Sequence, residues 1–124
     1  MTKPPLPNSY WLPGEKVCAG EYPGHWVEQT AKERIGLLLD AGIRSFLDLT
    51  ETSDPLEPYE DLLRVEAEER AVEVVYVRLA VRDMDVPPRE HMSRILDHID
   101  AEFEAGRKVY LHCWGGMGRT GTAV

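Results

Sequence analysis

A cysteine and an arginine frame a glycine-rich stretch near the end of the sequence. The stretch from Val109 to Thr122 reads V-Y-L-H-C-W-G-G-M-G-R-T-G-T, with Cys113 at its entrance and Arg119 at its exit. Glycines allow backbone N–H groups to turn inward without steric cost, and consecutive inward N–H groups form a nest for an anion. A helix that begins near Thr120 would add partial positive charge. These residue types therefore predict a cradle for a phosphate group.

The same two side chains predict chemistry on that phosphate. A helix N-terminus and a nearby cation both stabilise a thiolate, so we expect the thiol pKa of Cys113 to be depressed. The guanidinium of Arg119 can hold two phosphate oxygens at once. A phosphate held in this way would lie over the sulfur, which suits in-line attack and a covalent thiophosphate intermediate.

Alternating strand and helix patterns precede this stretch and must position it. Residues 109–112 are apolar or aromatic and predict a short buried strand. Residues 17–20, 43–49 and 74–79 predict three earlier strands, and helical spacing predicts helices at 27–39, 59–70 and from Pro87 to Phe103. Gly42 and Gly106 are expected to end the first and third helices. This order predicts an α/β fold with a mostly parallel central sheet flanked by helices on both faces.

Several finer expectations follow from the pattern. Residues 1–14 hold four prolines and predict an extended lead-in, anchored by Tyr10 and Trp11, and Cys18 is expected to be a small core residue. Asp48, Thr50 and Glu51 are expected to form and cap a turn. The alternative, which stays open, is that these three residues lie near the phosphate pocket. The second helix is expected to expose Glu66, Glu68, Glu69 and Arg70, and the third to bury Met92, Ile95, Leu96, Ile99 and Phe103.

The pattern His112-Cys113-x5-Arg119-Thr120 resembles the H-C-x5-R-[ST] signature of the cysteine-dependent protein tyrosine phosphatases, in the form of their dual-specificity, atypical branch. The resemblance implies a protein tyrosine phosphatase-like fold, with Cys113 as the nucleophile and Arg119 as the phosphate clamp. It further implies that the Thr120 hydroxyl stabilises the thiolate and that His112 orients the loop. The cradle wall would then consist of Trp114, Gly115, Gly116, Met117 and Gly118.

A leaving oxygen needs a proton, and the donor must come from a loop that meets the cysteine loop. Active loops of parallel α/β sheets gather at the carboxyl ends of the strands, and the segment after Leu79 carries Asp83 and Asp85. Either carboxyl could protonate the leaving oxygen and then activate water. We favour Asp83, which resembles the general acid of the family in lying 30 residues before Cys113. Asp85 is expected to lie near the N-terminus of the third helix, where its carboxylate interacts favourably with the helix dipole.

Composition limits the classes of function. The 124 residues predict one domain, and 43% apolar with 29% charged residues is typical of a globular protein. A formal net charge of -8 disfavours nucleic acid and anionic membranes as partners. There is no membrane-length apolar run or signal segment, and the two cysteines indicate a reducing, cytoplasmic location. The histidines have no ligand-set spacing, so neither a metal nor another cofactor is expected.

The end of the sequence departs from the family pattern. Family domains continue past the signature with further helices, whereas this sequence stops at Val124. We therefore expect the C-terminal part of the usual domain to be absent, one sheet face to be uncovered, and the chain to self-associate through that face.

The leading expectation is a phosphomonoester hydrolase that acts on phosphotyrosine in proteins, with phosphoserine and phosphothreonine as further substrates. A phosphoinositide or inositol phosphate phosphatase is an alternative, although such enzymes often place lysines in the loop and residues 114–118 contain none. A non-catalytic phosphate-binding module is a second alternative, against which stand the intact Cys113, Arg119 and Asp83. Arsenate reduction, which also uses a Cys-x5-Arg loop, is a third alternative. It normally needs additional resolving cysteines, and Cys18 is the only other cysteine in the sequence.

Overall fold

The structure is a computed structural model that describes residues 3–51, 56–80 and 89–112. Five strands form a single sheet in the order β1-β2-β5-β3-β4, and every neighbouring pair is parallel except β1 with β2. The predicted α/β fold with a mostly parallel sheet is therefore confirmed. In chain order the elements are β1 (Ser9–Trp11), β2 (Val17–Gly20), α1 (Glu28–Asp40), β3 (Ile43–Asp48), α2 (Glu60–Glu69), β4 (Val75–Arg78), α3 (Arg89–Glu104) and β5 (Lys108–His112).

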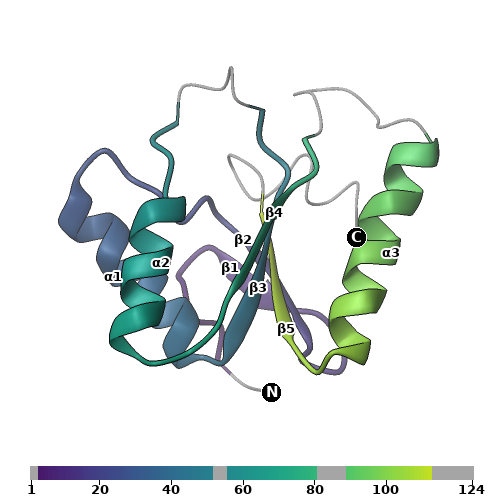
Figure 1. The fold of residues 1–124 in the computed structure, drawn as a ribbon, viewed down its shortest axis with the longest axis horizontal. Coiled ribbons are helices and arrows are strands. Elements are labelled where there is room, and N and C mark those ends of the chain that lie inside the picture. The colour runs from purple at the N-terminus through teal and green to yellow at the C-terminus, as the bar shows by residue number, and fades with distance from the viewer. Residues whose placement is uncertain (1–2, 52–55, 81–88, 113–124) are drawn as a thin grey trace.

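Helices cover both faces of the sheet, with α1 and α2 on one face and α3 on the other (Figure 1). The hydrophobic core is divided into two clusters, one on each face of the sheet, because successive side chains of a strand point to opposite faces. Phe46 and Tyr110 pack with the α1 and α2 side chains, including Ile35. Leu47 and Leu111 pack with α3 side chains, including Ile95, Ile99, Met92 and Phe103.

Glycines end two helices as the sequence predicts. Gly42 follows α1 with a φ of 95°, and Gly106 follows α3 with a φ of 78°. Both angles lie in the left-handed region that glycine adopts without the steric cost of a Cβ. The turns send the chain into β3 and β5 respectively.

The first fourteen residues contain a strand that the sequence pattern did not predict. β1 pairs antiparallel with β2, with Ser9 opposite Gly20 and Trp11 opposite Cys18. Trp11 is buried as expected, but Tyr10 is 42% exposed, so the expectation that Tyr10 anchors this segment is wrong. Strand alternation explains the difference, because neighbouring residues of a strand face opposite sides.

Two helical faces also differ from expectation. Glu66 was predicted on a solvated face but is only 8% exposed, and its carboxylate pairs with Arg70 at 3.2 Å. Leu96 was predicted in the core but is 46% exposed, whereas Glu102 is buried and pairs with Arg107 at 2.9 Å. A charged partner satisfies each buried carboxylate, which hydrophobic periodicity alone does not reveal.

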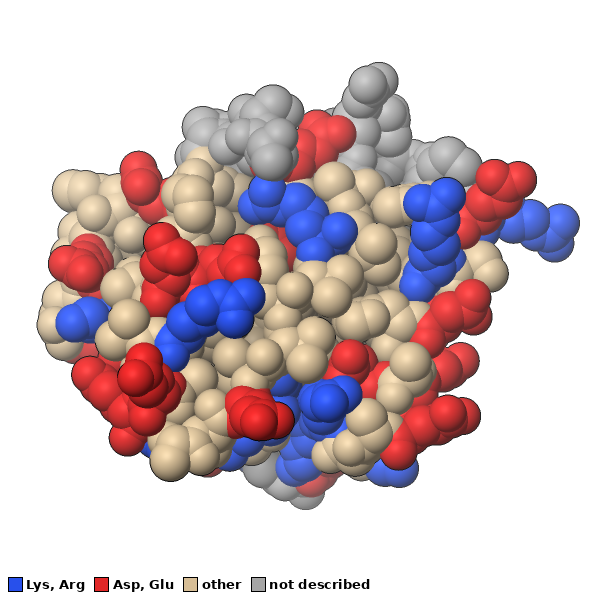
Figure 2. All heavy atoms as spheres, viewed as in Figure 1, with Lys and Arg blue, Asp and Glu red and all other residues tan. Residues whose placement is uncertain are grey.

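The surface carries charge of both signs. On the face in Figure 2, acidic side chains gather along α3 and around α1 and α2, with basic side chains between them. Within the described ranges, no helix combines the length and apolar character needed to cross a membrane.

Candidate active site

The carboxyl ends of the four parallel strands lie in one row. Gly20 of β2 pairs with His112 of β5, which pairs with Asp48 of β3, which in turn pairs with Arg78 of β4. We call these four residues the strand-end row. Two backbone hydrogen bonds continue the pairing, from Leu49 N–H to the His112 carbonyl and from Leu79 N–H to the Asp48 carbonyl, both at 2.9 Å.

Most predicted site residues lie outside the described residues. These are Cys113, the cradle residues 114–118, Arg119, Thr120 and the two candidate acids Asp83 and Asp85. Among the predicted site residues, His112 is the one that the structure describes. In the sequence, Cys113 directly follows His112, and Asp83 comes five positions after Arg78. Both predicted reactive groups therefore follow members of the strand-end row.

His112 is fully buried at the end of β5. Its Nε2 atom and the hydroxyl of Tyr59 share a hydrogen bond of 2.5 Å, and Tyr59 immediately precedes α2. The imidazole ring also lies 5.4 Å from the ring of Tyr22 and 5.7 Å from that of Tyr110, measured between ring centroids. This enclosure fixes the ring orientation of the residue that precedes the predicted nucleophile.

Asp48 lies beside His112 and links three strand ends. Its Oδ1 atom accepts hydrogen bonds from the Thr50 backbone N–H at 2.8 Å and from the Thr50 hydroxyl at 2.5 Å. Its Oδ2 atom accepts from the Tyr76 hydroxyl at 2.5 Å and from the Arg78 guanidinium at 3.3 Å. Nδ1 of His112 lies 4.0 Å from Oδ1. The predicted turn role of Asp48 and Thr50 is confirmed, and the carboxylate also joins β3 to β4.

The surroundings of this carboxylate set its charge state. Burial alone would raise the pKa of Asp48, but the charge of His112 and the hydrogen bonds from Thr50 and Tyr76 more than offset that effect, so its pKa lies below the ordinary value. Burial raises the pKa of Tyr76, and its hydrogen bond to the carboxylate raises it further. Burial also raises the pKa of Tyr59, with the Asp48 charge as the next cause. The tyrosines therefore stay protonated around an ionised carboxylate.

Sequence reasoning missed Tyr59, Tyr76 and Arg78 as supports of the site. We call these three residues, together with Asp48, Thr50 and His112, the buried polar cluster. One signal was available, because β4 reads V-Y-V-R and its period of two places Tyr76 and Arg78 on one face. That face could not be matched to Asp48 without knowing the strand order.

Cys18 is the cysteine that the structure describes, and its environment differs from that of a nucleophile. It is fully buried in β2, as predicted. Burial raises the pKa of its thiol to about 11, despite hydrogen bonds with Ser9 and Tyr10 that lower it. A thiol with this pKa holds almost no thiolate at neutral pH, so Cys18 is suited to packing and not to attack.

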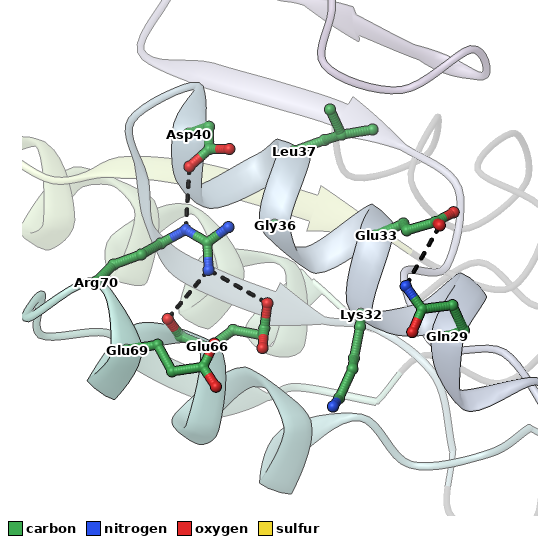
Figure 3. A pocket seen from close by; sticks show the side chains of 9 residues that line it. All are labelled: Gln29, Lys32, Glu33, Gly36, Leu37, Asp40, Glu66, Glu69 and Arg70. Carbon is green, nitrogen blue, oxygen red and sulfur yellow. Dashed lines mark hydrogen bonds and ion pairs between the residues drawn. The ribbon is translucent and has the colours of Figure 1, made fainter.

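An open groove between α1 and α2 is held by ion pairs (Figure 3). Arg70 donates to Asp40 at 3.0 Å and to Glu66 at 3.2 Å, which joins the two helices. Gly36 makes room for this arginine, since a Cβ there would lie 2.9 Å from an Arg70 nitrogen. The guanidinium is thus engaged in helix packing. Among the described residues, no group of three or more His, Cys, Asp or Glu side chains is placed to hold a metal ion.

Solved structures share this fold. Tk-PTP in its active form is 25% identical, with a TM-score of 0.67 over 94% of this chain and 69% of its own. A serine-for-cysteine variant of P. aeruginosa TpbA in complex with phosphotyrosine is 18% identical, with a TM-score of 0.61 over 98% of this chain and 62% of its own. PTPMT1 in complex with PI(5)P is 21% identical, with a TM-score of 0.58 over 82% of this chain and 59% of its own. The chain thus spans about three fifths to two thirds of these proteins.

Family comparison agrees with the structural comparison and covers most of the chain. No curated protein sequence matches the chain significantly. A family model described as "Polymorphic toxin system, DSP-PTPase phosphatase" matches residues 20–124, which include every residue of the strand-end row and the whole cysteine loop. The chain therefore belongs to this family of cysteine-dependent phosphatases of the protein tyrosine and dual-specificity type.

Proposed function

We propose that the chain hydrolyses phosphomonoesters in proteins, chiefly phosphotyrosine and also phosphoserine and phosphothreonine, through a cysteinyl-phosphate intermediate. The thiolate of Cys113 attacks phosphorus, the bond from phosphorus to the leaving oxygen breaks, and Asp83 gives that oxygen its proton. Water then attacks the phosphorus, Asp83 takes a proton from it, and the thiolate departs.

The remaining roles complete this mechanism. Arg119 and the backbone from Trp114 to Gly118 hold the phosphate oxygens, and the hydroxyl of Thr120 stabilises the departing thiolate. With a net charge of -8, the chain as a whole does not attract a doubly negative substrate, so the attraction is local to this loop. A free nucleophilic thiol requires a reducing compartment, and we propose the cytoplasm as the place of action.

The strand-end row is the observation that carries the proposal. His112 and Arg78 belong to neighbours of the same strand, β3, and both face the carboxylate of Asp48. The segments that hold Cys113 and Asp83 follow these two residues in the sequence. Nucleophile and acid must act on the same phosphate, and active loops of parallel sheets gather at the carboxyl ends of neighbouring strands.

A phosphoinositide is the second candidate substrate, since PTPMT1 shares the fold and was solved with PI(5)P. Two features favour a phosphoprotein. Residues 114–118 read W-G-G-M-G and hold no lysine to neutralise additional phosphates. The acidic chain is also poorly suited to an anionic membrane surface.

The test compares two cysteine variants under reducing conditions. Cys113→Ser should lose turnover of an aryl phosphate and of phosphotyrosine peptides while still binding the peptides, because the hydroxyl is not ionised at neutral pH. Cys18→Ala is the matched control and should keep turnover per folded molecule. Turnover by Cys113→Ser would contradict the mechanism, and binding without turnover by the unmodified chain would favour a phosphate-binding module. Turnover of phosphoinositide vesicles alone would contradict the substrate class.

A further inference from the structure

Leu79 directly follows β4 and is held at three points. Its backbone N–H donates to the Asp48 carbonyl at 2.9 Å, which continues the pairing of β4 with β3. Its side chain packs against the apolar cluster on the α3 face, as does the side chain of Met92. Its carbonyl oxygen shares a hydrogen bond of 3.3 Å with Nε2 of His91. The chain is therefore fixed at the point where it leaves the sheet.

His91 reaches this carbonyl from the first turn of α3, which begins at Arg89. The first turn of α3 and the carboxyl end of β4 lie at the same end of the sheet (Figure 1). A carbonyl oxygen only accepts hydrogen bonds, so Nε2 of His91 carries the shared proton, whether the imidazole ring is neutral or charged. The imidazole thus ties the start of α3 to the end of β4.

This tie joins the two ends of the segment that holds the proposed acid. Residues 80–90 connect Leu79 to His91, and Asp83 is the fourth residue after Leu79. Holding the ends of a connecting segment together removes many of the conformations that the segment could otherwise adopt. The hydrogen bond of His91 therefore restricts the positions that Asp83 can take.

The place of Leu79 suits an acid that serves Cys113. Leu79 follows Arg78, the member of the strand-end row on β4, and Cys113 follows the member on β5. β3 lies between these two strands, and neighbouring strands are about 4.8 Å apart, so the two strand ends are about 10 Å apart. Four residues span at most about 14 Å. Asp83 can therefore serve Cys113 only if the chain leaves Leu79 towards β5.

Proton transfer to a leaving oxygen depends on such placement, because the acid must lie within hydrogen-bonding reach of that oxygen. We propose that His91 is a positioning residue for the general acid, because its hydrogen bond to the Leu79 carbonyl directs the following residues, Asp83 among them, towards the strand-end row. In this role His91 touches neither the phosphate nor the reacting atoms. The inference rests on the proposed function and adds a supporting residue to it.

Leaving-group dependence tests this role. His91→Leu removes the donor, whereas His91→Gln keeps one, because the amide nitrogen of glutamine lies as many bonds from the backbone as Nε2 of histidine. His91→Leu should lower turnover of a phosphate ester with a poor leaving group about fivefold, the factor that one ordinary hydrogen bond contributes, and should affect an activated aryl phosphate much less. His91→Gln should keep most of the activity. The His91→Leu effect should vanish in an Asp83→Asn background, because the two residues act through the same step.

His98→Leu is the matched control, because it makes the same change on the same helix. His98 lies near Glu102, at 3.9 Å between Nε2 and Oε1, seven positions after His91. Its replacement should leave the ratio of turnover on the two substrates unchanged.

Amide exchange tests the tie without any turnover. The Leu79 N–H is bonded to the Asp48 carbonyl at 2.9 Å. The Leu49 N–H is bonded to the His112 carbonyl at the same distance and serves as an internal control. His91→Leu should speed exchange of the Leu79 amide about fivefold, measured by nuclear magnetic resonance, and leave the Leu49 amide unchanged, because only the end of β4 is released.

The outcomes separate the inference from the proposed function. Unchanged exchange of the Leu79 amide in His91→Leu would overturn the tie. Equal losses on both substrates, a loss that persists in the Asp83→Asn background, or a loss in His91→Gln as large as in His91→Leu would overturn the positioning role. If the unmodified chain turns over neither substrate while the Leu79 amide responds as expected, the tie is supported and the proposed function alone is contradicted.

Discussion

Replacing Asp48 with asparagine should destabilise the fold in a pH-dependent way. The change keeps the size of the side chain but removes the charge to which Tyr76 and Arg78 donate hydrogen bonds. Removing one partner of a buried ion pair typically costs about 3–5 kcal/mol. Because the Arg78 side chain is 30% exposed and its charge can reach water, we expect a smaller loss, about 2–3 kcal/mol. That is a large share of the roughly 5–15 kcal/mol that stabilises a typical domain.

The pH dependence distinguishes lost charge from general damage. The pKa of Asp48 is lower in the folded protein than its ordinary value, so its charge stabilises the fold above the unfolded-state pKa, which is about 3.9. This stabilisation is lost as the pH falls through the folded-state pKa. The stability difference between the unmodified chain and Asp48→Asn should therefore be full at neutral pH and shrink as the pH falls below about 4.

Urea unfolding at a series of pH values measures this difference. Asp40→Asn is the matched control, because Asp40 pairs with Arg70 at the surface and exposed pairs contribute at most about 1 kcal/mol. An equal loss of stability at pH 3 and pH 7 would refute the charge argument. A loss in Asp48→Asn no larger than that in Asp40→Asn would refute the structural role of the cluster.

Two further predictions concern the acid and the packing of β2. Asp83→Asn should lower turnover of a phosphate ester with a poor leaving group by roughly 100-fold or more, and should affect an activated aryl phosphate much less. Asp85→Asn should do little on either substrate. Steady-state kinetics on both substrates measure these effects, and the assignment of Asp83 is wrong if the two variants exchange behaviour. Gly20→Ala should lower the free energy of unfolding by about 1–3 kcal/mol, because its Cβ would lie 2.6 Å from Ser9 Cβ and from the Tyr110 hydroxyl. Thermal melts that match the unmodified chain would show that the backbone shifts to accept the methyl group.

Local sequence patterns predicted the elements that bury continuous apolar surface. The apolar runs of β3 and β5 and the helical spacing of the three helices predicted where these elements lie, although Glu66 and Leu96 face other sides than expected, and Gly42 and Gly106 mark where two helices end. β1 was missed because three residues near several prolines carry almost no periodic signal. The sequence also predicted a reactive loop, but Cys113 and Arg119 fall outside the described residues and their roles stay predictions.

The buried polar cluster could not be predicted because its partners are distant in sequence. Tyr59 and His112 are 53 positions apart, and Tyr76 and Asp48 are 28 apart. Each pair meets only after the strand order and the register are set. Polar residues at strand ends also commonly stabilise local turns, as Asp48 does by accepting hydrogen bonds from Thr50. The local pattern was therefore compatible with the cluster without indicating it.

The cluster in turn penalises the wrong register. Leu47 and Leu49 on either side of Asp48 are fully buried on the α3 face, among side chains such as Leu111 and Ile95. A slip of β3 by one residue would exchange the two faces and bring the Asp48 carboxylate into that apolar core. The donors Tyr76 and Arg78 would stay on the other face, and a buried charge without partners is far more costly than a misplaced leucine. The contacts of Asp48 with Tyr76 and Arg78 therefore also favour the register that aligns the carboxyl ends of β3 and β4.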